Sequence, residues 1–227
     1  MTMIADNLHQ VRARIATACN THGRAPDTVT LLAVSKTFGA DAVREAFAAG
    51  QTAFGENYIQ EAVEKMAALA DLPLQWHCIG PMQSNKTRLV AGHFDWAHTV
   101  DRLKIAQRLS EQRPAGMAPL NVCIQVNIDG GPTKAGVAPN EALALAQAVA
   151  ALPNLRLRGL MTIPEPAPDF VAACAVHMRA RALFDALNAA GLALDTLSMG
   201  MTGDMEAAIA SGSTMVRVGT AIFGVRF

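Results

Sequence analysis

Eight short, mainly apolar segments alternate with stretches of helical spacing, and this alternation constrains the fold most strongly. Short apolar runs are typical of strands buried on both faces, and their separation suits right-handed crossovers between parallel strands. The expected strands are 31–36, 52–55, 74–79, 94–100, 121–128, 155–163, 197–201 and 214–218. Eight such units in 227 residues predict an α/β protein, a single (β/α)₈ barrel of the TIM type near its lower limit of length.

A helical pattern also precedes the first strand. Ile4, Leu8, Val11 and Ile15 recur at helical spacing, which predicts an extra amino-terminal helix outside the barrel units. The other expected helices span about 41–50, 57–70, 84–92, 101–109, 140–152, 169–188 and 204–211. A doubly wound open sheet is the alternative architecture, and it is disfavoured because no expected strand is followed by a GxGxxG turn.

Composition bounds the number of domains and the range of partners. Because 51% of the chain is hydrophobic, it can bury one sizeable core, and residues 1–227 are expected to form a single domain. Lysine plus arginine and aspartate plus glutamate number 19 each, so no net field attracts nucleic acid or an anionic membrane. Any anion must therefore be recognised by local groups.

Secretion, membrane insertion and metal binding are not expected. Residues 1–10 lack the basic and apolar regions of a signal peptide, and the longest aliphatic segment, 142–155, is too short to span a bilayer. The four cysteines are scattered without a CxxC pair, which is typical of a reducing compartment. His93 and His98 lack the spacing of helical metal ligands. The sequence therefore predicts a cytoplasmic protein, which we expect to be a monomer.

Unusual polar residues lie at the ends of the expected strands. Lys36 ends the first strand, Asn57 follows the second, and His77 lies late in the third. The carboxyl ends of parallel barrel strands form one mouth, where active sites lie. A lysine desolvated there becomes a nucleophile toward aldehydes, whereas a lysine that simply extends into water does not. Both interpretations remain open for Lys36, and His77 is either a ligand-stacking group or a core histidine.

Residues near the ends of the seventh and eighth strands are suited to bind an anion. Thr202 and Gly203 lead into a short helix, and Gly219 and Thr220 offer a second set of amides and a hydroxyl. Ordinary turn glycines and a helix cap are the alternative explanation. Arg217 alternates with two valines, so it is expected to point into the barrel. A buried arginine needs an acceptor, either a structural carboxylate or a ligand.

A lysine nucleophile, an anion cradle and a buried arginine together indicate a phosphorylated aldehyde. Pyridoxal 5′-phosphate (PLP) fits all three, because the lysine would form a Schiff base, the cradle would hold the phosphate, and the arginine would contact the pyridine nitrogen. An arginine cannot accept the pyridinium proton, so the ring would be a poor electron sink. A Schiff-base aldolase for a phosphorylated sugar is a weaker alternative.

Eight short motifs occur in an order and spacing that resembles one known family. They are AVSKT at 33–37, FGENY at 54–58, WHCIG at 76–80, QSNK at 83–86, QVN at 125–127, GLMTIP at 159–164, LSMGM at 197–201 and VRVGTAIFG at 216–224. By these motifs, nearly the whole chain resembles the pyridoxal phosphate homeostasis protein family, the YggS/PROSC-like proteins. Members of that family are similar to the amino-terminal barrel of alanine racemase and other fold-type III enzymes.

The resemblance implies a cytosolic protein that holds PLP as a lysine Schiff base and buffers it or delivers it to apo PLP-dependent enzymes, without an established catalytic reaction. By resemblance, Lys36 carries the Schiff base and Arg217 faces the pyridine nitrogen. The implied phosphate-binding residues are Thr202, Gly219 and Thr220, and the implied pocket residues are Asn57, His77, Met161 and Met201.

A PLP-dependent amino-acid racemase is the alternative function. Alanine racemases supply a second base, a tyrosine, from a further domain of the partner subunit, whereas the only tyrosine here is Tyr58 and the expected barrel occupies the whole chain. Some positions depart from the family pattern. Phe38 stands where a second lysine often occurs, Thr202 where serine is common, and Gly131-Pro132 where glutamate is frequent. Lys134 remains as a second amine at the rim.

Overall fold

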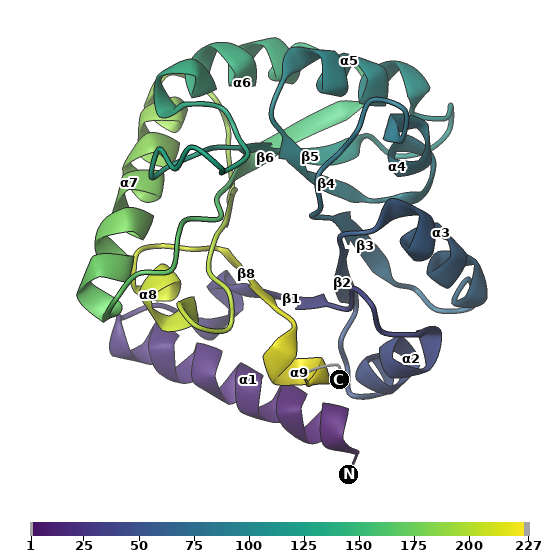
Figure 1. The fold of residues 1–227 in the computed structure, drawn as a ribbon, viewed down its shortest axis with the longest axis vertical. Helices are drawn as coiled ribbons and strands as arrows, with labels where there is room; N and C mark the ends of the chain where they lie inside the picture. Colours follow the sequence, from purple (N-terminus) through teal and green to yellow (C-terminus); the bar gives the residue numbers. More distant parts are fainter. Residues whose placement is uncertain (1, 225–227) are drawn as a thin grey trace.

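Eight parallel strands close into a barrel at the centre of the molecule (Figure 1). The computed structural model describes residues 2–224. Each strand pairs with its neighbours in chain order, and the last pairs with the first. The strands are β1 (Thr30–Val34), β2 (Ala53–Glu56), β3 (Gln75–Cys78), β4 (Trp96–Val100), β5 (Leu120–Gln125), β6 (Leu155–Met161), β7 (Thr196–Ser198) and β8 (Met215–Val218). This closed ring confirms the predicted barrel and excludes the open sheet.

Helices surround the barrel, and the predicted extra helix is present at the amino-terminal end. The helices are α1 (Met3–Thr21), α2 (Ala40–Ala48), α3 (Ile59–Ala68), α4 (Thr87–His93), α5 (Leu103–Gln112), α6 (Ala142–Ala150), α7 (Phe170–Ala189), α8 (Met205–Ala210) and α9 (Thr220–Phe223). In Figure 1, α1 runs along the outside of α8, α9 and α2, and it contacts all three. The sequence did not predict α9, because four residues are too few to display a helical period.

Several elements are shorter than predicted, and the differences fall at their ends. The first strand ends at Val34, two residues before Lys36, and β7 ends at Ser198. Helix α4 begins at Thr87, three residues after the expected start at residue 84. Asp169 caps α7, because its carboxylate accepts a hydrogen bond of 2.8 Å from the Ala172 amide.

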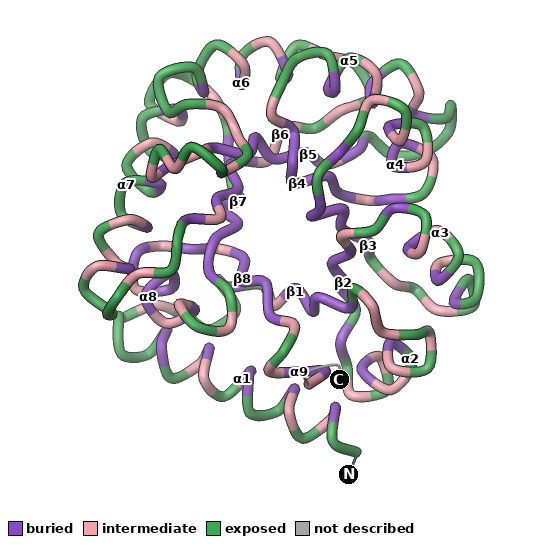
Figure 2. Tube along the Cα trace, viewed as in Figure 1, coloured by how far each residue is buried: buried purple, intermediate pink, exposed green. Residues whose placement is uncertain are grey.

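The two faces of each strand pack differently, as the alternating residues predict. Val122 and Ile124 on β5 and Val216 on β8 belong to the large apolar core shared with the helices. Cys123 faces the other way and joins Trp96 and Met161 in a small cluster inside the barrel. Figure 2 shows the result, a largely buried barrel wall and exposed outer turns on the helices. The same alternation turns Arg217 inward.

One close contact between strands requires glycine. A Cβ atom built on Gly159 of β6 would lie 1.6 Å from the backbone oxygen of Thr196 on β7. Backbone cannot yield to such an overlap without separating two paired strands, so a side chain at this position would act against closure of the barrel.

We therefore expect Gly159→Ala to destabilise the protein by about 2–3 kcal/mol or more, the usual effect of overpacking. Thermal unfolding followed by circular dichroism measures the change as a fall in melting temperature of about 4–12 °C. Gly92→Ala is the control, because a Cβ at Gly92 in α4 meets no atom within 4 Å. Equal melting temperatures for the two variants would contradict the role given to Gly159.

Candidate functional site

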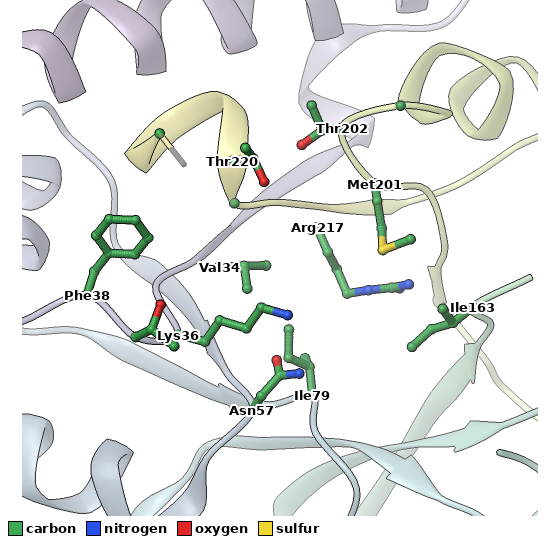
Figure 3. A pocket seen from close by; sticks show the side chains of 14 residues that line it. Val34, Lys36, Phe38, Asn57, Ile79, Ile163, Met201, Thr202, Arg217 and Thr220 are labelled. Atoms are coloured by element: carbon green, nitrogen blue, oxygen red, sulfur yellow. The ribbon is translucent and has the colours of Figure 1, made fainter. Parts of the chain in front are cut away.

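A cavity of about 540 Å³ lies at the carboxyl ends of the strands (Figure 3). Loops after β1, β2, β3, β6, β7 and β8 contribute its walls, as expected for the mouth of a parallel barrel. Seven of the nine residues predicted to bind PLP line it, namely Lys36, Asn57, Met201, Thr202, Arg217, Gly219 and Thr220. Their chemical roles remain predictions, but their convergence on one cavity is a feature of the fold.

Lys36 occupies a turn beyond the end of β1. The turn is tight, since Thr37 has a left-handed φ of +67° and the Phe38 amide donates to the Ser35 carbonyl at 3.1 Å. Figure 3 shows the Lys36 side chain extending into the cavity beside Asn57. Lys36 is exposed, because the chain leaves the strand before this residue. The cavity presents the amine to a ligand.

A buried ion pair behind the Lys36 turn holds the turn in place. Lys65 on α3 donates to Glu56 Oε1 at 2.6 Å and to the Ser35 carbonyl at 2.9 Å. The Ser35 hydroxyl donates to the same Glu56 oxygen at 2.6 Å, and the Thr37 amide donates to Glu61 at 2.9 Å. Burial raises the pKa of Glu56, although Lys65 and Ser35 oppose this change.

Sequence reasoning missed this ion pair. Lys65 lies in a polar-looking stretch of the α3 helix and Glu56 at the end of a strand, so neither stands out. The signal that could have revealed it is the acidic residue at the last position of an otherwise buried strand, which must find a buried cation.

Asn57 enters the cavity because the next loop comes unusually close to it. A Cβ atom on Gly80 would lie 2.2 Å from the Asn57 carbonyl oxygen, so only glycine permits this approach. Asn57 Oδ1 is buried and has no hydrogen-bond partner within residues 2–224. A buried amide oxygen of this kind is a ready acceptor for a donor on a ligand.

Two loops present hydroxyl groups to one space. Figure 3 shows the side chains of Thr202, after β7, and Thr220, after β8, directed into the region between their loops. Gly203 would allow a Cβ without any contact, and a Cβ on Gly219 would lie 3.1 Å from the Val34 oxygen. Hydroxyls beside accessible backbone, at the beginning of α9, are suited to the oxygens of an anion.

The Thr202 loop is held from outside the barrel. Asp204 accepts a hydrogen bond of 2.7 Å from the Met201 amide and one of 2.9 Å from His177 on α7. Arg14 on α1 donates to the Thr202 carbonyl at 3.1 Å. Partial burial would raise the pKa of Asp204, but the hydrogen bonds from His177 and the Met201 amide lower it below its ordinary value. The amino-terminal helix thus supports a wall of the cavity.

Arg217 is a buried cation without a bonded carboxylate. Its residue exposure is 4%, and its Nη atoms donate to Ser198 Oγ and to the Thr162 carbonyl, both at 2.8 Å. Among the described residues Asp204 acts on it only through space, so the alternative of a structural carboxylate partner is wrong. Burial lowers the pKa of Arg217 to about 10, so the guanidinium keeps its proton at neutral pH. Its charge is available to a ligand in the cavity.

The places predicted for His77 and Met161 need correction. Both have 0% exposure, and neither lines the cavity. His77 is bonded inside the barrel to His98 and Gln75 and stacks on Trp96 at 5.1 Å between ring centres. Met161 packs beside Trp96 in the same interior. The side chains of both residues therefore lie in the barrel interior, below the cavity at the mouth.

The cavity also has apolar walls that the sequence analysis did not identify. Three apolar residues lie at or just after the carboxyl ends of strands, namely Val34, Ile79 and Ile163. Phe38 closes one side of the cavity and stacks on Phe223. Their position relative to the strands could have identified them. They were missed because apolar residues at strand ends look like core residues.

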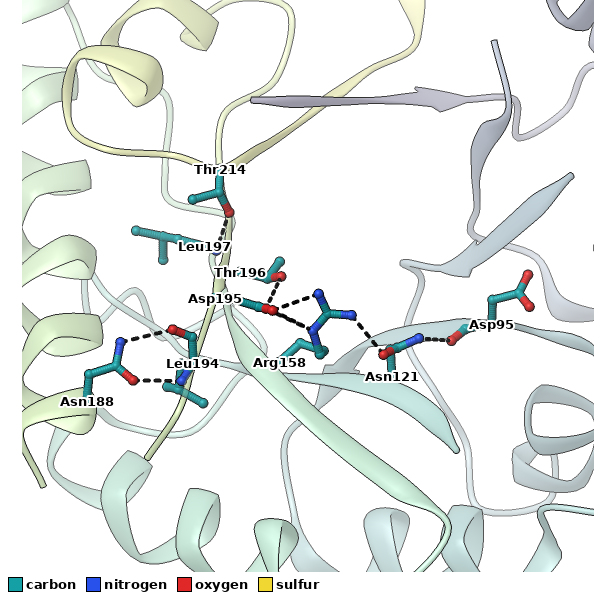
Figure 4. A network of polar contacts seen from close by, with 9 residues as sticks. All are labelled: Asp95, Asn121, Arg158, Asn188, Leu194, Asp195, Thr196, Leu197 and Thr214. Carbon is teal, nitrogen blue, oxygen red and sulfur yellow. Dashed lines mark hydrogen bonds and ion pairs between the residues drawn. The ribbon is translucent and has the colours of Figure 1, made fainter. Parts of the chain in front are cut away.

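A second polar cluster lies at the opposite, amino-terminal end of the strands (Figure 4). Arg158 on β6 donates to Asp195 at 2.8 Å and to Asn121 Oδ1 on β5 at 3.0 Å. Asn121 in turn donates to the Asp95 carbonyl at 3.1 Å, and the Arg158 guanidinium lies 4.6 Å from the centre of the Trp96 ring. These contacts fasten neighbouring strands together, so the cluster serves the barrel wall.

Residues 2–224 contain no group of three or more histidine, cysteine, aspartate or glutamate side chains arranged to hold a metal ion. No helix in this part of the chain is long and apolar enough to cross a bilayer.

Comparison with known proteins gives the same picture of the fold. The family model "Alanine racemase, N-terminal domain" matches residues 7–227. A curated relative from Pseudomonas aeruginosa, named pyridoxal phosphate homeostasis protein, is 63% identical, and the match covers 100% of this chain and 97% of the relative. PipY of Synechococcus elongatus, solved with PLP bound, is 39% identical with a TM-score of 0.85, covering 97% of this chain and 100% of PipY.

An alanine racemase from Clostridium difficile shares the fold. Its TM-score is 0.73 at 17% identity, and the match covers 97% of this chain but 57% of the racemase. At this identity the likeness concerns the barrel alone.

The buried ion pair behind the Lys36 turn leads to a stability prediction. Lys65→Met would leave the buried Glu56 carboxylate without its cation, and we expect a loss of about 3–5 kcal/mol. Without Lys65 the folded-state pKa of Glu56 rises further above the unfolded value, so the folded state binds the extra proton. Stability of the variant therefore falls as pH rises through that interval and is partly recovered at pH 5.

Chemical denaturation at pH 5 and pH 8 measures this difference. Glu56→Gln combined with Lys65→Met should recover part of the loss and abolish most of the added pH dependence. Arg44→Met is the matched control, because Arg44 pairs with Asp71 on the exposed surface and its loss should change stability little. A Lys65→Met variant as stable as wild type at pH 8 would contradict the stabilising role of the Glu56–Lys65 pair.

Proposed function

Because the chain belongs to the pyridoxal phosphate homeostasis protein family, we propose that it binds PLP in the barrel-mouth cavity and contributes to the homeostasis of this cofactor. One observation carries the proposal. The same cavity presents the Lys36 amine, the Arg217 guanidinium without a bonded carboxylate, and the hydroxyls of Thr202 and Thr220. These groups match an aldehyde, a hydrogen-bond acceptor and a phosphate on one small ligand.

Each residue has a separate role in the proposal. PLP supplies an aldehyde carbon that bonds reversibly to amines. The Lys36 amine would attack that carbon, the carbonyl oxygen would leave as water with the two amine protons, and a C=N bond to Nζ would remain as a Schiff base. Thr202, Gly219 and Thr220 hold the phosphate, and Asn57 and Met201 contact the ligand from the sides. The supported pocket set therefore omits His77 and Met161.

A carrier is favoured over a racemase by the chemistry of the cavity wall. Within residues 2–224, Lys36 and Arg217 are the only ionisable side chains that line the cavity. Racemisation needs a second proton-transferring group on the opposite ring face, and a guanidinium is a poor base. Tyr58 does not line the cavity. The proposal is therefore a non-enzymatic carrier that keeps the reactive aldehyde bound until it is passed on.

The domain organisation, oligomeric state, location and partners of the protein complete the proposal. We propose that residues 1–227 act as one domain and as a monomer in the cytoplasm, and that apo PLP-dependent enzymes receive the cofactor. Nucleic acid and membranes are not expected partners, because the 19 basic and 19 acidic residues balance. Lys134, paired with Glu165 at 3.2 Å, lies outside the cavity lining and has no assigned role.

Lys36→Ala tests the covalent attachment. Borohydride reduces a C=N bond to a stable amine, so wild-type protein incubated with PLP and reduced should carry the label on the Lys36 peptide in mass spectrometry. We expect the amount of label in Lys36→Ala to fall by at least 90%, about tenfold, because no other lysine among residues 2–224 lines the cavity. Lys104→Ala is the control, because Lys104 is an exposed residue of α5, and this variant should be labelled as the wild type is. Wild-type protein labelled mainly at another lysine would contradict the proposal.

Proton exchange separates the carrier from the racemase. The PLP-loaded protein is incubated with D- or L-alanine in deuterated water, and nuclear magnetic resonance follows the α-proton. We expect exchange no faster than with free PLP at the same concentration, because the described part of the chain places no second base in the cavity lining. Many turnovers of α-proton exchange per protein would establish the racemase alternative and refute the carrier.

A further inference from the structure

An unbroken chain of hydrogen bonds runs through the barrel interior from Arg217 to the opposite end. Arg217 Nη1 lies 2.8 Å from Ser198 Oγ, and Ser198 Oγ lies 3.0 Å from His98 Nδ1. His98 Nε2 lies 2.9 Å from His77 Nδ1, and His77 Nε2 lies 3.0 Å from Gln75 Oε1. The three middle residues have 0% exposure, whereas Gln75 is exposed at the first position of β3. We call these five side chains the relay.

The direction of every bond in the relay follows from its first member. A guanidinium can only donate, so Ser198 accepts from Arg217 and its own proton is free for His98 Nδ1. His98 must then carry its proton on Nε2 and donate it to His77 Nδ1. His77 likewise carries its proton on Nε2 and donates to Gln75. In this arrangement the Ser198 hydroxyl proton and all four imidazole nitrogens are hydrogen-bonded.

The opposite direction would leave a buried proton without a partner. If both imidazoles carried the proton on Nδ1, Ser198 Oγ would accept from Arg217 and from His98 at once. Its hydroxyl proton would then need a third partner, and Ser198 Oγ has no further hydrogen bond among residues 2–224. An unpaired buried hydroxyl is unfavourable, so the first arrangement is preferred.

Both imidazoles are neutral, as the relay requires. Burial lowers the pKa of His77 to about 3. Burial, together with repulsion from His77 and Arg217, lowers the pKa of His98 well below its ordinary value. Trp96 packs against both rings, at 5.1 Å from His77 and 5.8 Å from His98 between ring centres, and excludes water from that side.

We propose that Ser198 and His98 are positioning residues, which hold the Arg217 guanidinium through neutral acceptors so that its charge and its remaining N–H groups face the ligand. The inference rests on the proposed function of the cavity. The Ser198 hydroxyl and the Thr162 carbonyl bind one Nη atom each. A carboxylate in their place would cancel the charge, whereas aligned dipoles stabilise the guanidinium and leave its charge intact.

Two variants at one position separate the acceptor from the rest of the imidazole. In His98→Asn the side-chain oxygen can occupy the place of Nδ1 and still accept from Ser198, whereas His98→Leu offers no acceptor. We expect Ser198→Ala and His98→Leu to weaken PLP binding by about tenfold or more, as for the loss of a hydrogen bond to a charged group. His98→Asn should stay within about threefold of wild type. Exposed His93 provides the controls His93→Asn and His93→Leu, expected to bind as wild type.

The readout that a merely structural role would not produce is the tautomer of each histidine. In ligand-free wild-type protein labelled with ¹⁵N-histidine, two of the six histidines should show Nε2–H tautomers that do not titrate between pH 5 and pH 8. The loss of one signal set in His98→Asn assigns them. The measurement needs no ligand and is made on wild-type protein, and His98→Asn serves only to assign the two signal sets. An Nδ1–H tautomer or protonation of either imidazole in that range would overturn the relay.

Titration with PLP, measured by calorimetry, completes the test and separates the two proposals. Expected tautomers together with wild-type affinity in Ser198→Ala and His98→Leu would overturn the positioning role but leave the cavity as the PLP site. Absence of PLP binding by wild-type protein would refute the proposed function, and with it the ligand role of the relay. Weakened binding in those two variants, near-normal binding in His98→Asn and the expected tautomers together would support the inference.

Discussion

Pairing between the first and last strands is the contact on which the candidate site depends. Leu32 lies opposite Arg217 and Ala33 opposite Val218, so the loops that follow β1 and β8 leave the barrel at the same height. The Lys36 turn thereby meets Gly219 and Thr220, which are distant in the sequence. A sheet open at this seam would keep every local motif but would separate the amine from the anion-binding loop. Closure of the ring creates the cavity.

Two buried cations have different kinds of hydrogen-bond partner. Lys65 meets a carboxylate directly, at 2.6 Å from Glu56, and this pair fixes the backbone on which Lys36 is carried. Among the described residues, Arg217 donates hydrogen bonds to a hydroxyl and a carbonyl, which orient its guanidinium without neutralising it. The first arrangement suits support of a loop, because a paired charge has little left to offer a ligand. The second suits recognition, because a desolvated and unneutralised cation is strongly attracted to an acceptor.

The cavity combines strong groups for holding a ligand with few groups for transforming it. Its apolar walls and threonine hydroxyls can bind and orient, and the Lys36 amine can form a reversible covalent bond. Proton transfer at a ligand carbon needs a base placed on a defined face, and Arg217 is unsuited to that task. A site built in this way retains an aldehyde and releases it when another amine competes. That behaviour fits a protein concerned with the supply of a cofactor.

Sequence alone determined the barrel, the order of its elements and the side of the barrel on which the site lies, because apolar periodicity and strand-end position are local properties of the chain. It also identified seven residues of the cavity by those positions. The sequence could not determine how far below the mouth of the barrel each inward-facing side chain lies. The side chains of His77 and Met161 point into the barrel, but the registers between strands place them below the mouth. The Glu56–Lys65 pair and the partners of Arg217 were likewise decided by tertiary structure, because contacts between residues far apart in sequence depend on how strands and helices pack.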